Sequence, residues 1–183
     1  MAVYTKIDKS DIKLISTKFK IEKIISFQGI KQGIENTNYL LKSKNKKFIL
    51  TIFEKRVSNK EVPFFMKLMD KLNSSKINCP KPLRTKSDSY LIKLKKKTAC
   101  IVSFLEGKDK KKLNIKDCYS VGKITARMHL VTKKLKLYRK NSMGIKNLNP
   151  LLKSIKFKGN KFSKIDLFLK NNLNDINKHW PKK

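Results

Sequence analysis

The apolar residues in the first part of the chain occur in short runs, and this spacing constrains the fold more than any other feature. Runs 36–41 and 48–53 are rich in Tyr, Ile and Phe, and the polar stretch KSKNKK separates them. Runs 91–94 and 99–104 are separated in the same way by lysines. Apolar runs of about four to eight residues between polar turns are typical of strands, and short connections favour antiparallel hairpins. We therefore expect two pairs of strands.

Helical spacing begins after the first strand pair. Ser58 and Glu61 fit a capping box, in which the Ser hydroxyl and the Glu carboxylate satisfy two open backbone N–H groups. Apolar residues then recur at helical spacing from position 65 to position 72, which predicts a helix that ends near residue 73. The two prolines in 77–83 indicate an extended segment there.

The remaining segments complete the predicted order of elements. Ser10 is a candidate N-cap for a short helix, 19–27 reads as a strand, and 28–35 reads as a turn with two glycines. Apolar spacing predicts two further helices, over 114–130 and 163–180. Because strands cluster first and helices follow, the predicted fold class is α+β.

The net charge is unusually high. The chain has 46 Lys and Arg against 13 Asp and Glu, which gives +33. Such a balance favours a polyanionic partner. However, only four of these cations are arginine, the residue that binds phosphates and bases bidentately, and the lysines are spread along the whole chain. We therefore interpret most of the charge as a solvated surface and expect no nucleic-acid partner, with a basic RNA-associated protein as the alternative.

Three patterns are missing from the sequence. No apolar run approaches the roughly 18 residues that a membrane span needs, and the N-terminal residues lack the apolar core of a secretory signal. We therefore expect a cytoplasmic protein without a membrane partner. The three cysteines are widely spaced and form no CxxC pair, so we expect buried thiols and assign no metal ligand.

Six segments carry a resemblance to a known family: GIKQGIENTNYLL (29–41), FILTIFEKRV (48–57), VPFFMKLMDKL (62–72), INCPKPL (77–83), CIVSFLEG (100–107) and VGKITARMHL (121–130). Together they strongly resemble the bacterial homoserine kinases, which have the aminoglycoside-phosphotransferase/choline-kinase fold. The resemblance implies a protein-kinase-like small lobe over 1–106, made of an antiparallel sheet and a helix, with a hinge at its end. It implies that 107–183 holds the first helices of an incomplete, mainly helical large lobe.

The resemblance also implies an activity. Enzymes of this family transfer the γ-phosphoryl group of ATP, with Mg²⁺, to the hydroxyl of L-homoserine in threonine biosynthesis. In this fold the chemistry needs an Asp that accepts the substrate proton, an Asn five residues later and a further Asp for Mg²⁺. The family places a His two residues before the first Asp, and neither His129 nor His179 is followed by Asp at that spacing. We therefore assign no catalytic residue and interpret the chain as the N-terminal portion of such an enzyme, inactive alone, with the metal ligands in a C-terminal part.

The turn between the first two strands is the implied cover for the phosphates. Gly29 and Gly33 allow backbone N–H groups to approach an anion closely, and Asn36 and Asn38 add side-chain amide donors. The spacing Gly-x3-Gly differs from the GxGxxG loop of protein kinases, and no Walker motif is present. Without the resemblance, the same residues read as an ordinary hairpin turn.

The cation that pairs the phosphates departs from the kinase pattern. The central position of the third strand is Thr51, where kinases of this fold have a cation. Lys55 shares the strand face of Thr51 by period-two counting and is the candidate. The alternative is that Lys55 is one of many surface lysines.

The hinge is the implied site for adenine. Backbone groups near Phe104 and Glu106 would meet the adenine edge. An ordinary buried strand that ends in a turn explains the apolar run 100–104 equally well. Besides the kinase, an ATP-binding remnant or interaction lobe that needs a C-terminal complement therefore stays open.

Overall fold

The computed structural model describes residues 3–54 and 59–141, and in the remainder 144, 147, 150, 167–168, 171–173, 175 and 178–179. The chain forms two compact units, Met1–Tyr138 and Arg139–Lys183. In the second unit, the described residues of the predicted helix 163–180 are helical.

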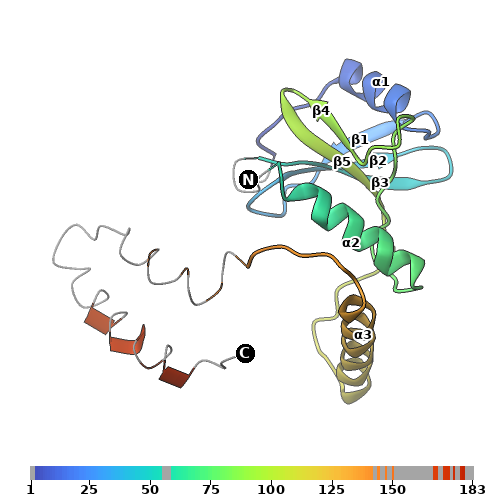
Figure 1. The fold of residues 1–183 in the computed structure, drawn as a ribbon. Coiled ribbons are helices and arrows are strands. Elements are labelled where there is room, and N and C mark those ends of the chain that lie inside the picture. The colour runs from blue at the N-terminus through green and yellow to red at the C-terminus, as the bar shows by residue number, and fades with distance from the viewer. Residues whose placement is uncertain are drawn as a thin grey trace. The chain divides into compact units, whose positions relative to one another are not determined.

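The first unit is built around a five-stranded sheet (Figure 1). Its strands are β1 (Ser26–Gly29), β2 (Thr37–Lys42), β3 (Lys47–Ile52), β4 (Leu91–Leu94) and β5 (Lys97–Ser103). They lie in the order β1-β2-β3-β5-β4, and every neighbouring pair is antiparallel. The two predicted strand pairs are therefore present, and so is the predicted α+β class.

One face of the sheet holds the larger core. Helix α1 (Lys9–Lys18) contributes Ile15, and Phe19 follows it directly. Both are fully buried against residues of β2, β3 and β5 such as Leu41, Leu50 and Ile101. Alternation along β2 and β3 places every second residue on this face, which fits the apolar spacing of the two runs.

Helix α2 (Val62–Ser74) covers part of the opposite face. Val62 and Met66 pack on Cys100 and Val102 of β5. Figure 1 shows α1 and α2 on opposite sides of the sheet. The core cluster under α2 draws its strand residues from β3, β4 and β5, and contains no described residue of β1 or β2. The residues of β1 and β2 on this face therefore take no part in the cluster under α2.

Three sequence predictions are corrected at element ends. Helix α1 is capped by Asp8, whose carboxylate accepts from the N–H groups of Ser10 and Asp11, so Ser10 is not the N-cap. Helix α2 has Glu61 as its N-cap residue, so the helix begins later than a Ser58 cap predicts; Ser58 lies outside the described residues. The strand expected over 19–27 is wrong except at its end, because only Ser26–Gly29 pairs with β2.

Helix α3 (Ile115–Lys133) confirms the predicted helix over 114–130 but lacks a buried side. It starts with a capping box in which Asn114 and Asp117 bind each other's backbone N–H. None of its residues is buried, and it exposes large apolar side chains: Ile115, Tyr119, Val121, Ile124, Met128 and Leu130.

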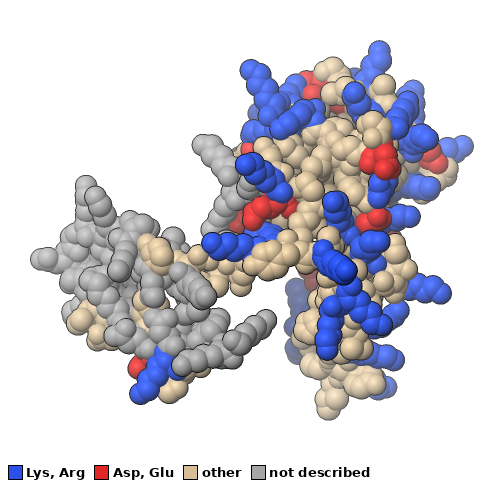
Figure 2. All heavy atoms as spheres, viewed as in Figure 1, with Lys and Arg blue, Asp and Glu red and all other residues tan. Residues whose placement is uncertain are grey.

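The surface of the described residues is dominated by lysine. Figure 2 shows Lys and Arg spread over the visible face of the lobe, with few Asp and Glu among them. No helix in the described part of the chain is long and apolar enough to cross a membrane. Of the cysteines, Cys100 is buried, Cys79 is half-buried and Cys118 is exposed, so the expectation of buried thiols is correct only for Cys100.

Candidate nucleotide-binding site

The α2 side of the sheet carries rows of residues that the strand register places side by side. One row is Gln28, Leu40, Ile49 and Val102, from β1, β2, β3 and β5 in turn. Directly opposite residues of an antiparallel pair share a face. Ile49 and Val102 pack toward α2, whereas Gln28 is exposed and Leu40 is half-buried. The β1–β2 half of this face is therefore an open strip beside α2.

The turn that connects β1 to β2 lies at one end of this strip. Gly33 has φ 116°, a left-handed conformation that strains other residues. A Cβ on Gly29 would lie 2.9 Å from Cγ2 of Val3, so only glycine fits there without a shift. Among the hydrogen bonds of the described residues, the backbone N–H groups of 31–34 have no protein acceptor. The turn thus combines close backbone approach with N–H groups available to an anion.

Asn36 and Asn38 turn their amide oxygens toward the protein. Oδ1 of Asn36 accepts from the backbone N–H of Glu54 at 3.3 Å, and a backbone N–H only donates, so this atom must be the oxygen. Oδ1 of Asn38 accepts from Oγ1 of Thr51 at 2.8 Å. Among the described residues no acceptor binds either Nδ2 group. Both residues therefore retain amide donors next to the turn.

The structure does not describe the cation expected at this site, Lys55. Thr51 lies opposite Asn38 in the register of β2 and β3, and its hydroxyl is engaged with that residue. Ile49 and Phe53 belong to the cluster under α2, so the period-two count that places Thr51 on this face holds as far as Phe53. Lys55 lies outside the described residues. Its role stays a prediction.

The segment after β5 is tied to the start of β3 by a lysine that the sequence reasoning missed. Phe104 N–H donates to the carbonyl of Lys47 at 3.2 Å. The ammonium of Lys47 lies 2.7 Å from Oε1 of Glu106 and 5.4 Å from the centroid of the Phe104 ring. Lys47 therefore contacts both candidate hinge residues, Glu106 through an exposed ion pair and Phe104 through a cation–π contact. The hairpin register was its only sequence signal, because Lys47 stands beside Lys46 and other exposed lysines.

Glu54 is the centre of a second cluster at the end of β3. Its carboxylate accepts from the hydroxyls of Thr5 and Thr37, each at 2.7 Å, and forms a short ion pair with Lys97. The Glu54 side chain is only 10% exposed. Burial raises the pKa of Glu54, but the bonds from Lys97, Thr5 and Thr37 outweigh burial and hold the pKa below its ordinary value. Glu54 is thus ionised and already occupied by protein partners.

The shifted pKa of Glu54 gives a test by pH. Ionised Glu54 contributes stability that is present above its ordinary pKa of 4.5 and lost as the pH falls through the lower folded value. We expect Glu54→Gln to lower the free energy of unfolding by about 1–3 kcal/mol at pH 7. The difference from the native chain should shrink below pH 4.5 in urea titrations. Asp109→Asn, at an exposed residue without a described partner, is the control; a difference independent of pH would contradict the assignment.

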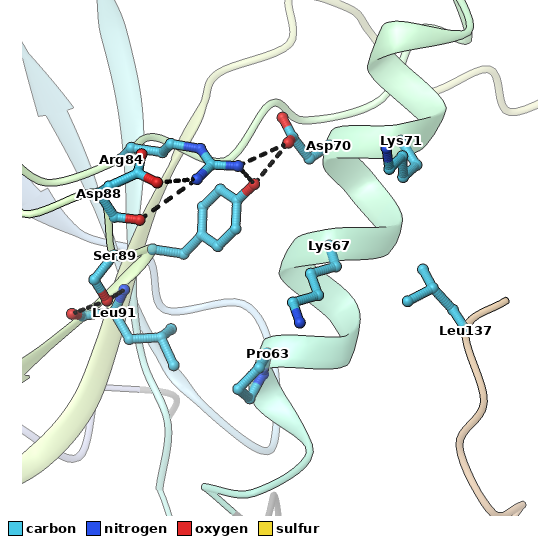
Figure 3. Close-up of a pocket in the computed structure, with 10 residues that line it drawn as sticks. Pro63, Lys67, Asp70, Lys71, Arg84, Asp88, Ser89, Leu91 and Leu137 are labelled. Carbon is cyan, nitrogen blue, oxygen red and sulfur yellow. Dashed lines mark hydrogen bonds and ion pairs between the residues drawn. The ribbon is translucent and has the colours of Figure 1, made fainter. Parts of the chain in front are cut away.

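A cavity of the described residues lies elsewhere, between α2 and β4 (Figure 3). It has a volume of about 460 Å³, and Lys67 and Lys71 line it from α2. Arg84 lies at its edge, where it binds Asp88 at 2.8 Å and Asp70 at 3.3 Å and stacks on the Tyr90 ring. Burial and the bond to Asp70 raise the pKa of Tyr90, so its hydroxyl stays protonated. None of the predicted ATP-binding residues lines this cavity.

The described residues contain no candidate for the catalytic loop or for its metal ligands. They contain no cluster of three His, Cys, Asp or Glu side chains that could hold a metal ion. Asp109 and Asn114 have the Asp-x4-Asn spacing, but Oδ1 of Asn114 accepts from Asp117 N–H as the α3 cap. Glu54 and Glu106 already pair with lysines. The described residues therefore supply no set of ligands for Mg²⁺.

Three features together define a kinase-like small lobe. They are an antiparallel five-stranded sheet, helix α2 packed on one of its faces, and a glycine-containing turn between the first two strands. A family model agrees with this class. The chain belongs to the phosphotransferase enzyme family, whose model matches residues 26–156, more than half of the chain.

Curated relatives and a solved structure refine the comparison. Homoserine kinase of Paramagnetospirillum magneticum is 33% identical over 183 residues, which is 100% of this chain and 56% of the relative. Homoserine kinase of Bartonella tribocorum is 39% identical over 145 residues, 79% of this chain and 46% of the relative. The chain thus spans about half the length of the curated relatives it matches. An amicoumacin kinase in complex with AMP-PNP, Ca²⁺ and Ami shares the fold, with a TM-score of 0.69 at 15% identity over 97% of this chain and 55% of that chain.

Proposed function

We propose that this lobe binds ATP on the open β1–β2 strip beside α2, as part of a homoserine kinase. The observation that carries the proposal is the orientation of Asn36 and Asn38, which leaves two amide donors beside a glycine-containing turn with available N–H groups. Donors of this kind suit phosphate oxygens. The AMP-PNP in the related amicoumacin kinase supports the same ligand class.

The proposed roles follow from position along the strip. Gly29 and Gly33 let the turn approach the phosphates, and Asn36 and Asn38 donate to them. At the other end, Leu40 presents a half-buried apolar side chain toward the adenine, while Phe104 and Glu106, both in contact with Lys47, form the proposed hinge. Lys55 is proposed as the cation for the phosphates.

The reaction proposed for the whole enzyme is phosphorylation of the L-homoserine hydroxyl by ATP with Mg²⁺, in the cytoplasm. The named function of the relatives supports this substrate. The 183 residues contain no His-x-Asp followed by Asn at the family's spacing. Binding and orientation of the nucleotide are therefore the contribution we assign to them.

Asn38→Asp tests the phosphate end of the site. The new carboxylate still accepts from Thr51, but its second oxygen replaces an amide donor with a negative charge. We expect AMP-PNP to bind about 10- to 100-fold more weakly, because a like charge now faces the phosphates. Isothermal titration calorimetry measures the change. Asn114→Asp, which keeps an acceptor at the α3 N-cap, is the matched control and should bind as the native chain does; equal affinity of Asn38→Asp would contradict the assigned role.

A second function is favoured by α3. We also propose a lobe boundary at 106/107, with α3 as the first helix of a large lobe that needs a C-terminal complement. This 19-residue helix has no buried residue and six exposed large apolar side chains, so its contacts with the described residues, such as the Arg127 bonds to the carbonyls of Ser75 and Lys76, bury little apolar surface. If the lobe acts as an interaction partner, a polypeptide that corresponds to the C-terminal half of the relatives should bind it. This binding should protect the backbone amides of α3 from hydrogen exchange. Unchanged α3 exchange in the presence of that chain would contradict this function.

A further inference from the structure

The N-terminal segment lies against the turn between β1 and β2. The hydroxyl of Tyr4 donates to the carbonyl oxygen of Ile34 at 2.9 Å. Val3 fills the space beside Gly29, where a Cβ would come within 2.9 Å of it. Residues 31–34 make no backbone–backbone hydrogen bond among the described residues, and the Ile34 side chain is 83% exposed. The Tyr4 bond is therefore a tether at the tip of an otherwise weakly held turn.

The segment itself is firmly anchored. The backbone N–H groups of Tyr4 and Thr5 both donate to Oγ1 of Thr37, at 3.0 and 3.1 Å. The Thr37 hydroxyl in turn donates to Glu54, and Thr37 is fully buried. The carbonyl of Thr5 also accepts from the Tyr39 hydroxyl at 3.0 Å. The Tyr4 ring thus projects from an anchored backbone, and its hydroxyl reaches the Ile34 carbonyl.

We propose that Tyr4 is a positioning residue that holds the turn in the conformation that receives the phosphates of a nucleotide. Because the peptide unit is planar, a bond to the Ile34 carbonyl fixes the orientation of the whole 34–35 peptide. The second tether is the Asn36 bond to Glu54 N–H, so the two ends of segment 34–36 are both fixed to the same anchored region. Holding a loop in its bound conformation raises affinity by lowering the ordering cost. This inference rests on the proposed function.

Tyr4→Phe is the test, since it removes one hydroxyl and leaves the ring. Tyr4 is 57% exposed, so the fold should be retained. We expect AMP-PNP to bind about 2- to 10-fold more weakly, the loss of one hydrogen bond, with the affinity for adenosine unchanged because adenosine lacks the phosphates. Tyr119→Phe, at an exposed tyrosine of α3 whose hydroxyl has no described partner, is the control and should change neither affinity.

Backbone dynamics separate this inference from the function beneath it. In Tyr4→Phe, the amide order parameters of 31–36 should fall while those of β5 stay unchanged, whether or not nucleotide is present. If the native chain binds neither AMP-PNP nor adenosine, the proposed function fails and the positioning role fails with it, although the order parameters still report the tether. If the native chain binds but Tyr4→Phe weakens both ligands equally, or neither, Tyr4 has no positioning role. Unchanged order parameters over 31–36 overturn the tether itself.

Discussion

Leu50→Ala is expected to lower the free energy of unfolding of the sheet lobe by about 2–5 kcal/mol. Leu50 is fully buried in the middle of β3, where it lies opposite Tyr39 of β2 and Ile101 of β5. Its side chain belongs to the larger core between the sheet and α1. Truncation leaves a cavity that three strands surround, and they cannot all move inward without breaking the ladder. Urea unfolding followed by circular dichroism measures the loss.

Leu113→Ala is the matched control for Leu50→Ala. Leu113 is 68% exposed just before α3, so its truncation should change the free energy of unfolding by less than about 0.5 kcal/mol. Equal losses for the two variants would show that β3 is not the centre of the core. That result would also remove the support for the register on which the candidate site is built.

The 183-residue chain is expected to show no phosphoryl transfer to homoserine. Transfer in this fold needs a carboxylate that accepts the substrate proton and further carboxylates for Mg²⁺. Among the described residues, Glu54 and Glu106 are held by lysines, and Asp117 caps α3 and pairs with Lys110. Removing the base and metal ligands from an enzyme that depends on them lowers its rate by several orders of magnitude. A coupled ADP assay should therefore stay at background.

The control for this assay is nucleotide binding by the same preparation. AMP-PNP binding shows that the lobe is folded and competent to hold ATP. Turnover that requires both Mg²⁺ and homoserine would contradict the prediction, and it would mean that other residues of the chain supply the base.

The predictable part of this fold is the part governed by local pattern. The β2–β3 and β4–β5 pairs follow from apolar runs separated by lysine-rich turns, and α2 from its apolar period. The strand over 19–27 was predicted wrongly because apolar alternation does not report pairing. Phe19 forms only an isolated bridge with Thr85, and Ile24 is buried in the core before β1 begins. Asp8 and Ser10 are both acceptable caps, so sequence alone does not choose between them.

The candidate site was only partly accessible to sequence reasoning. The resemblance pointed to Gly29, Gly33, Asn36 and Asn38, which all lie between positions 29 and 38. Lys47, Glu54 and Tyr4 were missed as site residues. Their partners are 59, 43 and 30 positions away in the sequence. Such contacts depend on the strand order of the whole sheet, and no local pattern in a lysine-rich chain identifies them.

The most direct test of the nucleotide site is a titration of the labelled 183-residue chain with AMP-PNP, followed by amide chemical shifts. The account predicts shifts that concentrate in 29–40, around Thr51 and in 102–106, along the open strip and its hinge. Adenosine alone should move the hinge group but not the turn. No shift at all, or shifts centred on Asp70, Arg84 and Tyr90 at the α2–β4 cavity, would contradict it.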